Sequence, residues 1–141
     1  MPRLRPGLLV LTIVAASLAG CAAFVEDRAA TREDAAEAAY PPTGRLIEAD
    51  GHRVHAHVEG SGPDLVLIHG ASGNTRDMTF SLAPRLAERY RVIVIDRPGL
   101  GYTERLNETG ATLKQQADLL VATARQMGAD RPIVLGHSYG G

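Results

Sequence analysis

The residues with the clearest chemical potential lie at the end of the chain, where Gly136-His137-Ser138-Tyr139-Gly140-Gly141 follows the apolar run Ile133-Val134-Leu135. A Gly-x-Ser-x-Gly pattern after a buried strand is typical of a nucleophile elbow, a sharp turn from strand to helix that presents one serine. Gly136 and Gly140 lie two residues before and after that serine, where the absence of a side chain lets the two backbones cross closely. Ser138 is therefore the candidate catalytic nucleophile.

A serine of this kind needs a histidine as its base and a carboxylate to orient the histidine. In this class of elbow, both partners come later in the chain than the serine. Only three residues follow Ser138 here. We therefore expect the chain to be the front half of a hydrolytic domain, lacking the acid and the histidine and inactive by itself, while a longer parent protein carries them.

The elements that would position Ser138 can be read from the apolar pattern. Two segments flank Asp50-Gly51, a dipeptide suited to a tight hairpin turn, which predicts two antiparallel strands. Three later apolar runs are continuous rather than alternating, so each predicts a parallel strand buried on both faces. These runs are Leu65–Ile68, Val92–Ile95 and Ile133–Leu135.

Two helices are predicted between the parallel strands. From Thr112, a Thr-Leu-Lys-Gln capping box opens a helix that Gly128 can close. Its apolar residues at helical spacing are Leu113, Ala117, Leu120, Val121 and Ala124. The segment 77–89 also predicts a helix, with a kink or restart caused by Pro84. Strand, helix, strand, helix, strand indicates an α/β fold with right-handed crossovers.

The N-terminal segment predicts a secretory signal peptide over residues 1–20. It begins with Arg3 and Arg5, continues through an apolar run from Leu8 to Ala19, and closes on small residues. The run is shorter than the roughly 20 apolar residues that span a bilayer. The junction Leu18-Ala19-Gly20-Cys21 resembles the lipobox of bacterial lipoproteins, which implies that Cys21 is lipidated and becomes the new N-terminus.

This resemblance implies a protein of the bacterial cell envelope, anchored to a membrane through its N-terminal lipid and facing the periplasm or the exterior. Residues 21–43 are rich in alanine and charge and end in Tyr40-Pro41-Pro42, a composition that fits a tether. The folded region is expected over residues 44–141. The alternative is an ordinary signal peptide whose cysteine lies near the cut by chance.

Composition excludes some functions. The formal net charge is −1, and no cluster of Lys and Arg offers a surface for phosphates, so a nucleic-acid partner is not expected. Cys21 is the single cysteine, which rules out an intrachain disulfide framework. His52, His55 and His57 could approach a metal, but no cysteine or suitably spaced carboxylate completes a zinc set. We therefore expect neither a metal nor a cofactor, and regard this as a polar strand face.

Taken together, the motifs resemble the N-terminal half of the α/β-hydrolase family over residues 44–141. The resemblance rests on the order of the hairpin, His69-Gly70-Ala71-Ser72, Asp96-Arg97-Pro98-Gly99-Leu100-Gly101 and the elbow at successive strand ends. It implies an antiparallel hairpin followed by three parallel strands with crossover helices. It also implies a serine hydrolase that acts on an ester or similar small-molecule acyl substrate.

The same resemblance implies an oxyanion hole made of two backbone amides, those of Ala71 and Tyr139, with Gly70 in the oxyanion loop. It assigns structural roles to His69 and to the loop that follows Asp96, with Arg97 and Tyr102 lining the entrance. His137 adjoins Ser138, but neighbouring side chains on an elbow diverge, so His137 is not expected to be the base.

Other functions remain open. The same fold supports carbon–carbon bond hydrolysis, acyl transfer and cofactor-free peroxidase activity, and Ser138 alone does not separate them. The serine does argue against the haloalkane dehalogenase and epoxide hydrolase branches, which place an aspartate at the elbow. A different class of function is a non-catalytic surface lipoprotein that uses the fold as a binding module.

Overall fold

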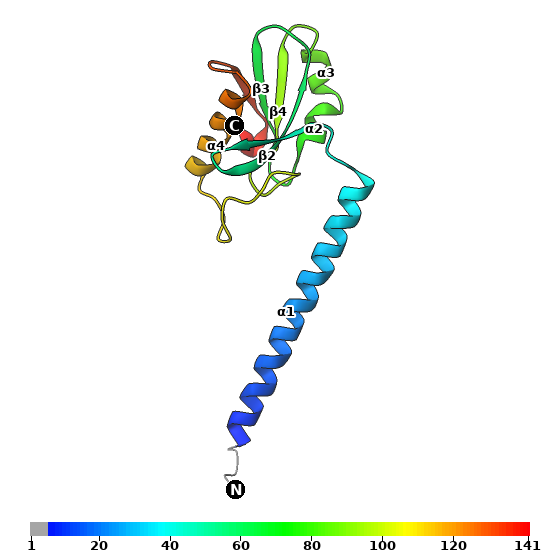
Figure 1. The fold of residues 1–141 in the computed structure, drawn as a ribbon, viewed down its shortest axis with the longest axis vertical. Coiled ribbons are helices and arrows are strands. Elements are labelled where there is room, and N and C mark those ends of the chain that lie inside the picture. Colours follow the sequence, from blue (N-terminus) through cyan, green and yellow to red (C-terminus); the bar gives the residue numbers. More distant parts are fainter. Residues whose placement is uncertain (1–5) are drawn as a thin grey trace. The chain divides into compact units, whose positions relative to one another are not determined.

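The structure, a computed structural model, describes residues 6–141, so Arg3 and Arg5 of the predicted signal peptide lie outside the described residues. The described chain forms two compact units, Met1–Pro41 and Pro42–Gly141. The second unit begins two residues before the predicted start of the folded region at Gly44. Figure 1 shows the first unit as one helix and the second as a sheet with helices.

The first unit is the helix α1, Pro6–Ala39. It continues without interruption past Cys21 because this stretch is rich in alanine, which has the highest helix propensity. It ends just before Tyr40-Pro41-Pro42, where a residue that precedes proline is disfavoured in the helical region. The segment predicted as a tether is therefore helical through Ala39, and the predicted cleavage before Cys21 falls inside the helix and stays a prediction.

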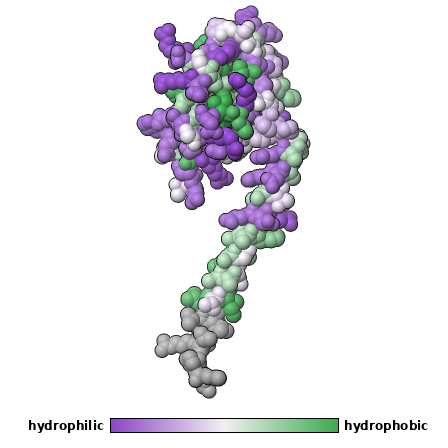
Figure 2. All heavy atoms as spheres, in the orientation of Figure 1, coloured by the Kyte–Doolittle hydropathy of each residue, from purple (hydrophilic) through white to green (hydrophobic). Residues whose placement is uncertain are grey.

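Within α1, the part Val10–Ala39 is long and apolar enough to cross a membrane, with a mean hydropathy of 1.7 in its most apolar window. This stretch is longer than the predicted apolar run from Leu8 to Ala19, because Phe24 and Val25 continue the apolar character beyond the small residues around Cys21. A signal sequence at an N-terminus passes the same test of length and composition. Figure 2 shows hydrophobic side chains in the N-terminal part of α1 and more hydrophilic ones further along.

The second unit is built on a sheet of five strands in the order β1-β2-β4-β3-β5. The strands are β1 (Arg45–Ala49), β2 (His52–Glu59), β3 (Asp64–Ile68), β4 (Arg91–Ile95) and β5 (Ile133–Gly136). The first two form the predicted antiparallel hairpin, and the last three are parallel to one another as predicted. β2 joins the two groups by pairing antiparallel with β4.

The hairpin turn has the predicted geometry. Asp50 and Gly51 both have positive φ, 48° and 75°, which matches the twist of the flanking strands. At the other edge of the sheet, β5 pairs with β3 alone in the part of the chain that the structure describes, and its residues are exposed. Ile133, Val134 and Leu135 are thus accessible apolar side chains on an edge strand. The prediction that this run is buried on both faces is wrong for the described chain, because β5 has a neighbouring strand on one side only.

Two short helices, α2 (Thr75–Thr79) and α3 (Leu82–Leu86), connect β3 to β4. The predicted break occurs, but it lies at Phe80 and Ser81 rather than at Pro84 itself. Pro84 is the third residue of α3, where a helix makes no use of the backbone N–H. The second helix therefore begins two residues before Pro84, which places the proline in the first turn of α3.

The helix α4 (Leu113–Gln126) connects β4 to β5 and has the predicted capping box between Thr112 and Gln115. Gly128 follows with a φ of 80°, as a C-terminal cap requires. The predicted apolar stripe is only partly buried, because Leu113 and Val121 are 66% and 49% exposed. These two side chains instead line an open hollow.

The hollow lies between α4 and the β3–β5 edge and has a volume of about 500 Å³. Its floor includes Val66, Ile68 and Val134 from the sheet. The elbow residues Tyr139 and Gly140 also line it. Figure 2 shows a hydrophobic patch ringed by hydrophilic side chains on the viewed face of this unit.

The sheet separates two apolar clusters that hold its strands in place. One contains Ile93 and Ile95 of β4 with Leu119 and Leu120 of α4. The other joins the opposite face of β4 to residues of α2 and α3. The central strand β4 is fully buried over Val92–Ile95, so the residues that follow it are held rigidly at the carboxyl end of the sheet.

Candidate active site

Ser138 lies on a sharp turn directly after β5. Its φ is +55°, a left-handed backbone conformation that a serine adopts at a cost of about 1 to 3 kcal/mol. The turn continues as a single 3-10 turn over Ser138–Gly140. The hydroxyl is exposed and has no hydrogen-bond partner among the residues that the structure describes. The geometry is that of the elbow expected from the motif.

The two elbow glycines are required by close backbone contacts. A Cβ added to Gly136 would overlap the carbonyl oxygen of Gly140, and one added to Gly140 would lie 2.6 Å from the carbonyl oxygen of Ile68. The turn therefore folds back on itself and against the end of β3. Larger residues at either position would push Ser138 away from the sheet.

The loop after β3 lies against the elbow. A Cβ added to Gly70 would lie 3.2 Å from both the Ser138 Cβ and the carbonyl oxygen of His137. The amides of Ala71 and Tyr139, the predicted oxyanion donors, make no hydrogen bond to any residue in the described chain. Two unused N–H groups are thus available beside the exposed serine.

His69 and Arg97 hold this loop. The backbone N–H of Arg97 donates to Nε2 of His69 at 3.0 Å, so Nε2 carries no proton. The proton is on Nδ1, which donates to the carbonyl oxygen of Gly70 at 2.9 Å. A guanidinium N–H of Arg97 donates to the same oxygen at 3.3 Å. His69 is fully buried with both ring nitrogens engaged, so it is not available as a base for Ser138.

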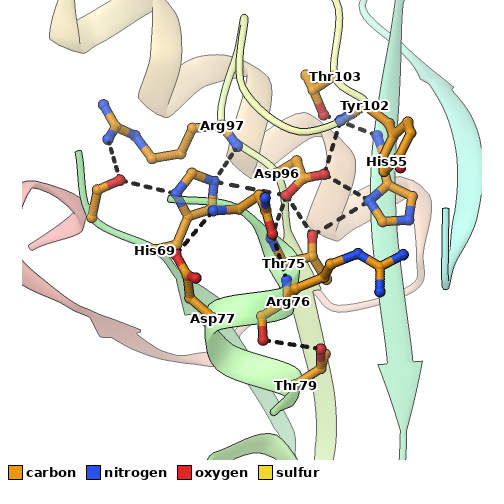
Figure 3. A network of polar contacts seen from close by, with 12 residues as sticks. His55, His69, Thr75, Arg76, Asp77, Thr79, Asp96, Arg97, Tyr102 and Thr103 are labelled. Atoms are coloured by element: carbon orange, nitrogen blue, oxygen red, sulfur yellow. Dashed lines mark hydrogen bonds and ion pairs between the residues drawn. The ribbon is translucent and has the colours of Figure 1, made fainter. Parts of the chain in front are cut away.

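Asp96 is the centre of a buried polar network at the carboxyl end of β4 (Figure 3). Its carboxylate accepts hydrogen bonds from His55 Nδ1 at 2.7 Å and from the backbone N–H and hydroxyl of Thr75, both at 2.5 Å. The backbone N–H of Tyr102 adds a fourth at 3.1 Å. Burial alone would raise the pKa of Asp96, but these hydrogen bonds outweigh it and hold the pKa below its usual range.

His55 and Asp96 resemble the histidine and acid that a serine nucleophile uses, but they have another role. Nε2 of His55 accepts from the backbone N–H of Gly44 at 3.0 Å, so the nitrogen that would take a proton from a serine is occupied. His55 is 1% exposed, which corrects the expectation of a polar strand face. The pair ties the hairpin to β4 and to the first turn of α2.

Arg97 is more deeply buried than a residue at an entrance was expected to be. It is 6% exposed and lines the hollow together with Tyr139, and it contacts both the oxyanion loop and the elbow. Its guanidinium carbon is 4.5 Å from the centre of the Tyr139 ring, and Nη2 donates to Gln116 of α4 at 2.7 Å. No local pattern in the sequence could reveal these contacts, because the partners are 19 to 42 residues away.

Among the residues that the structure describes, no group of three or more His, Cys, Asp or Glu side chains could hold a metal ion. Of the predicted site residues, Ser138, Gly136, Gly140, Gly70, Ala71 and Tyr139 are brought together at the ends of β3 and β5. Cys21 belongs to the other unit, where it is exposed.

Comparison with known proteins gives a consistent family. The sequence model described as alpha/beta hydrolase fold matches residues 63–141. A dihydrolipoyllysine-residue acetyltransferase component of an acetoin cleaving system from Cupriavidus necator is 40% identical over 114 residues, which are 79% of this chain and 28% of that protein. A 2-hydroxymuconate semialdehyde hydrolase from Pseudomonas sp. is 34% identical over 72% of this chain and 36% of its own length.

A solved structure of a membrane phospholipase A, described as a bacterial virulence factor, superposes with a TM-score of 0.64 and 26% identity. The superposition covers 97% of this chain and 45% of that one. The chain thus spans about a third of the length of the two curated relatives and less than half of the phospholipase.

Proposed function

The chain belongs to the alpha/beta hydrolase fold family, and from this premise we propose that the complete protein is a serine hydrolase that cleaves an ester or similar acyl bond. The observation that carries the proposal is Ser138, exposed at a φ of +55° on the turn after β5, with its hydroxyl bonded to no described residue. In open α/β sheets, ligands bind at the carboxyl ends of the strands, which is where this serine lies.

The proposed reaction has two steps. The Ser138 hydroxyl attacks the acyl carbon and loses its proton to a base, and the alcohol leaves with a proton to form an acyl-enzyme. Water then cleaves the acyl-enzyme and restores the serine. In both steps the acyl oxygen becomes an oxyanion, for which the free amides of Ala71 and Tyr139 are the proposed donors.

The base is proposed to come from the part of the fold that the relatives possess and this chain does not span. His55 and His69 have both ring nitrogens engaged in hydrogen bonds. His57 lies on the hairpin strand β2, where its ring nitrogens are near Thr43 and Glu59. The histidine and the acid that Ser138 requires would therefore lie beside it only in the complete protein.

The likeness to a membrane phospholipase A over 97% of the chain favours a lipid ester as the substrate class. The helix α1, apolar and exposed over much of its N-terminal half, would keep the enzyme at a membrane surface where such substrates are concentrated. We propose that this attachment is a lipid on Cys21 after cleavage of residues 1–20, which would locate the enzyme in the bacterial cell envelope.

A second candidate is carbon–carbon bond hydrolysis, favoured by the identity of 34% to a 2-hydroxymuconate semialdehyde hydrolase. The two candidates differ in substrate. Release of fatty acid from phospholipid or of p-nitrophenol from its esters favours the first, and cleavage of 2-hydroxymuconate semialdehyde with no esterase activity favours the second. A binding module without catalysis would do neither.

The direct test of the nucleophile is covalent capture. A fluorophosphonate probe, which forms a stable bond with activated serines, should label the complete protein on the peptide that contains Ser138. Mass spectrometry of the labelled peptide identifies the serine. Failure of the probe to react with the folded, complete protein would exclude an activated serine. The remaining candidate function would then be a binding module without catalysis.

Replacing Ala71 by proline is expected to lower turnover by about 10² to 10³-fold, because proline has no backbone N–H and one oxyanion donor is lost. The measurement is kcat for a p-nitrophenyl ester in the complete protein. Ala71→Ser, which keeps the amide, is the matched control and should retain most of the activity. Unaltered turnover in a folded Ala71→Pro protein would refute the role of this amide.

Replacing Cys21 by alanine is expected to abolish incorporation of radiolabelled palmitate, because the thioether and the new amino terminus that carry the lipids cannot form. The protein is expressed with its native N-terminus in a bacterial host and followed by autoradiography. Label that persists in Cys21→Ala would contradict lipidation at this residue. Membrane retention of an unlabelled, uncleaved protein would instead indicate that α1 spans the bilayer.

A further inference from the structure

We propose that Arg97 is a positioning residue, whose guanidinium sets the orientation of the Gly70–Ala71 peptide and so aims the Ala71 N–H at the reacting acyl oxygen. The inference deepens the proposed function and rests on it. It concerns a residue that makes no hydrogen bond to Ser138 and acts through the backbone of the oxyanion loop.

The first step of the argument is the geometry of one peptide unit. In a trans peptide, the C=O of Gly70 and the N–H of Ala71 are in one plane and point in opposite directions. Whatever holds the Gly70 oxygen therefore also aims the Ala71 N–H. That oxygen accepts from Nδ1 of His69 at 2.9 Å and from Nη1 of Arg97 at 3.3 Å. With its oxygen held on the side of these two donors, the peptide presents its N–H to the opposite side.

The second step is that both donors depend on Arg97. Its backbone N–H donates to Nε2 of His69, which leaves the imidazole proton on Nδ1, the atom that faces Gly70. Its side chain supplies the other donor directly. A carbonyl held by two donors resists a peptide flip more strongly than one held by a neighbouring side chain alone.

The third step is that the guanidinium is itself held in place. Nη2 of Arg97 donates to Oε1 of Gln116 at 2.7 Å, and Nε2 of Gln116 donates to the carbonyl oxygen of Ala111 at 3.0 Å. The guanidinium also stacks on the ring of Tyr139 at 4.5 Å. Tyr139 carries the other proposed oxyanion amide, so Arg97 contacts the peptide unit of one donor, through the Gly70 oxygen, and the side chain of the residue that carries the other.

The loop needs such a restraint because its own backbone does not supply one. Ser72 has a φ of +56°, and the stretch around it contains two glycines, so the chain can adopt other conformations at small cost. No backbone hydrogen bond from Ala71 holds this part of the described chain. Charge-assisted hydrogen bonds from a planar guanidinium are both strong and directional.

The first experiment measures Arg97→Met in the complete protein. Its kcat should fall about 10 to 100-fold, less than for a full loss of one donor, because His69 still restrains the peptide, while KM stays within about twofold. The inhibition constant of a trifluoromethyl ketone, whose adduct with serine carries an oxyanion, should rise by the same factor as kcat/KM falls. Arg85→Met, at an exposed position on α3, is the matched control and should change neither.

Gln116→Met tests the chain of contacts. As a single substitution it should lower kcat, because it removes the acceptor of Nη2 of Arg97. In the double variant with Arg97→Met, kcat should be no lower than in Arg97→Met alone. A loss of kcat without a change in the inhibition constant of the ketone would overturn the proposal, because it would mean fewer active molecules rather than a misaligned donor. An unchanged kcat in Arg97→Met would also overturn it.

A second measurement needs no turnover. Labelling with ¹³C-carbonyl glycine and ¹⁵N alanine makes each Gly–Ala peptide visible as one signal, and this chain has three, at Gly70, Gly110 and Gly128. Arg97→Met should shift the Gly70–Ala71 signal and leave the Gly128–Ala129 signal unchanged. An unmoved Gly70–Ala71 signal overturns the positioning role. Should Ser138 prove unreactive in the parent protein, the proposed function fails, and this signal still decides whether Arg97 orients the peptide.

Discussion

Replacing Ser138 by alanine in the complete protein is expected to lower ester hydrolysis by on the order of 10⁴ to 10⁶-fold, the largest effect of any single change considered. The reason is that, in the proposed reaction, the oxygen of this hydroxyl forms the bond of the acyl-enzyme. Without it, only binding and the oxyanion amides remain to assist attack by water. The measurement is the initial rate with p-nitrophenyl esters, together with fluorophosphonate labelling.

Ser81→Ala is the matched control for this change. Ser81 precedes α3, is exposed, and makes no capping hydrogen bond with its side chain, so its removal should leave the rate and the labelling intact. The thermal midpoint of Ser138→Ala should stay close to that of the parent, because the lost hydroxyl has no partner in the described chain. A variant that kept a rate within tenfold of the parent would show that another residue is the nucleophile.

Replacing Asp96 by asparagine is expected to lower the free energy of unfolding by about 3 to 5 kcal/mol, because four donors converge on this buried carboxylate. An asparagine amide offers one oxygen and turns its NH₂ group toward donors that then lose their acceptor. Urea denaturation at pH 7 measures the effect. Asp118→Asn, where the carboxylate forms an exposed pair with Lys114, should cost no more than about 0.5 kcal/mol.

The pH dependence of this effect has a definite sign. The folded-state pKa of Asp96 is below its value in the unfolded chain, so the carboxylate stabilises the fold fully above the unfolded pKa of about 3.9. That stabilisation is lost as the pH falls through the folded-state pKa. The difference in unfolding free energy between the parent protein and Asp96→Asn should therefore be constant near neutral pH and shrink below about pH 4. A difference that grows on acidification would contradict an ionised Asp96.

Several features of the fold could be predicted because each depends on neighbouring residues. The Asp50-Gly51 turn, the capping box at Thr112 and the Gly128 cap are local patterns with one favourable backbone geometry. The parallel strands followed from continuous apolar runs. Where prediction was only partly right, the missing information was the packing partner. Leu113 and Val121 have the spacing of a buried helix face, yet in this chain they line an open hollow.

The features of the candidate site also fall into those that the sequence predicted and those that it did not. The Gly-x-Ser-x-Gly spacing by itself predicted the elbow and its candidate nucleophile, since a backbone crossing at that turn permits only glycine at positions 136 and 140. Sequence reasoning did not find the roles of His55 and Arg97. Each depends on a hydrogen bond between residues 27 to 41 positions apart, and no local pattern encodes that distance.

The amino-acid sequence alone therefore determined the order of strands and helices, the position of the strained serine and the family to which these motifs point, because these follow from short-range backbone sterics and apolar periodicity. Only the tertiary structure decided which histidines are occupied, what Asp96 binds and which side chains hold the oxyanion loop. The physical reason is that the sheet brings the ends of β2, β3, β4 and β5 together, and buried polar groups must take their partners from whatever chain segments meet there.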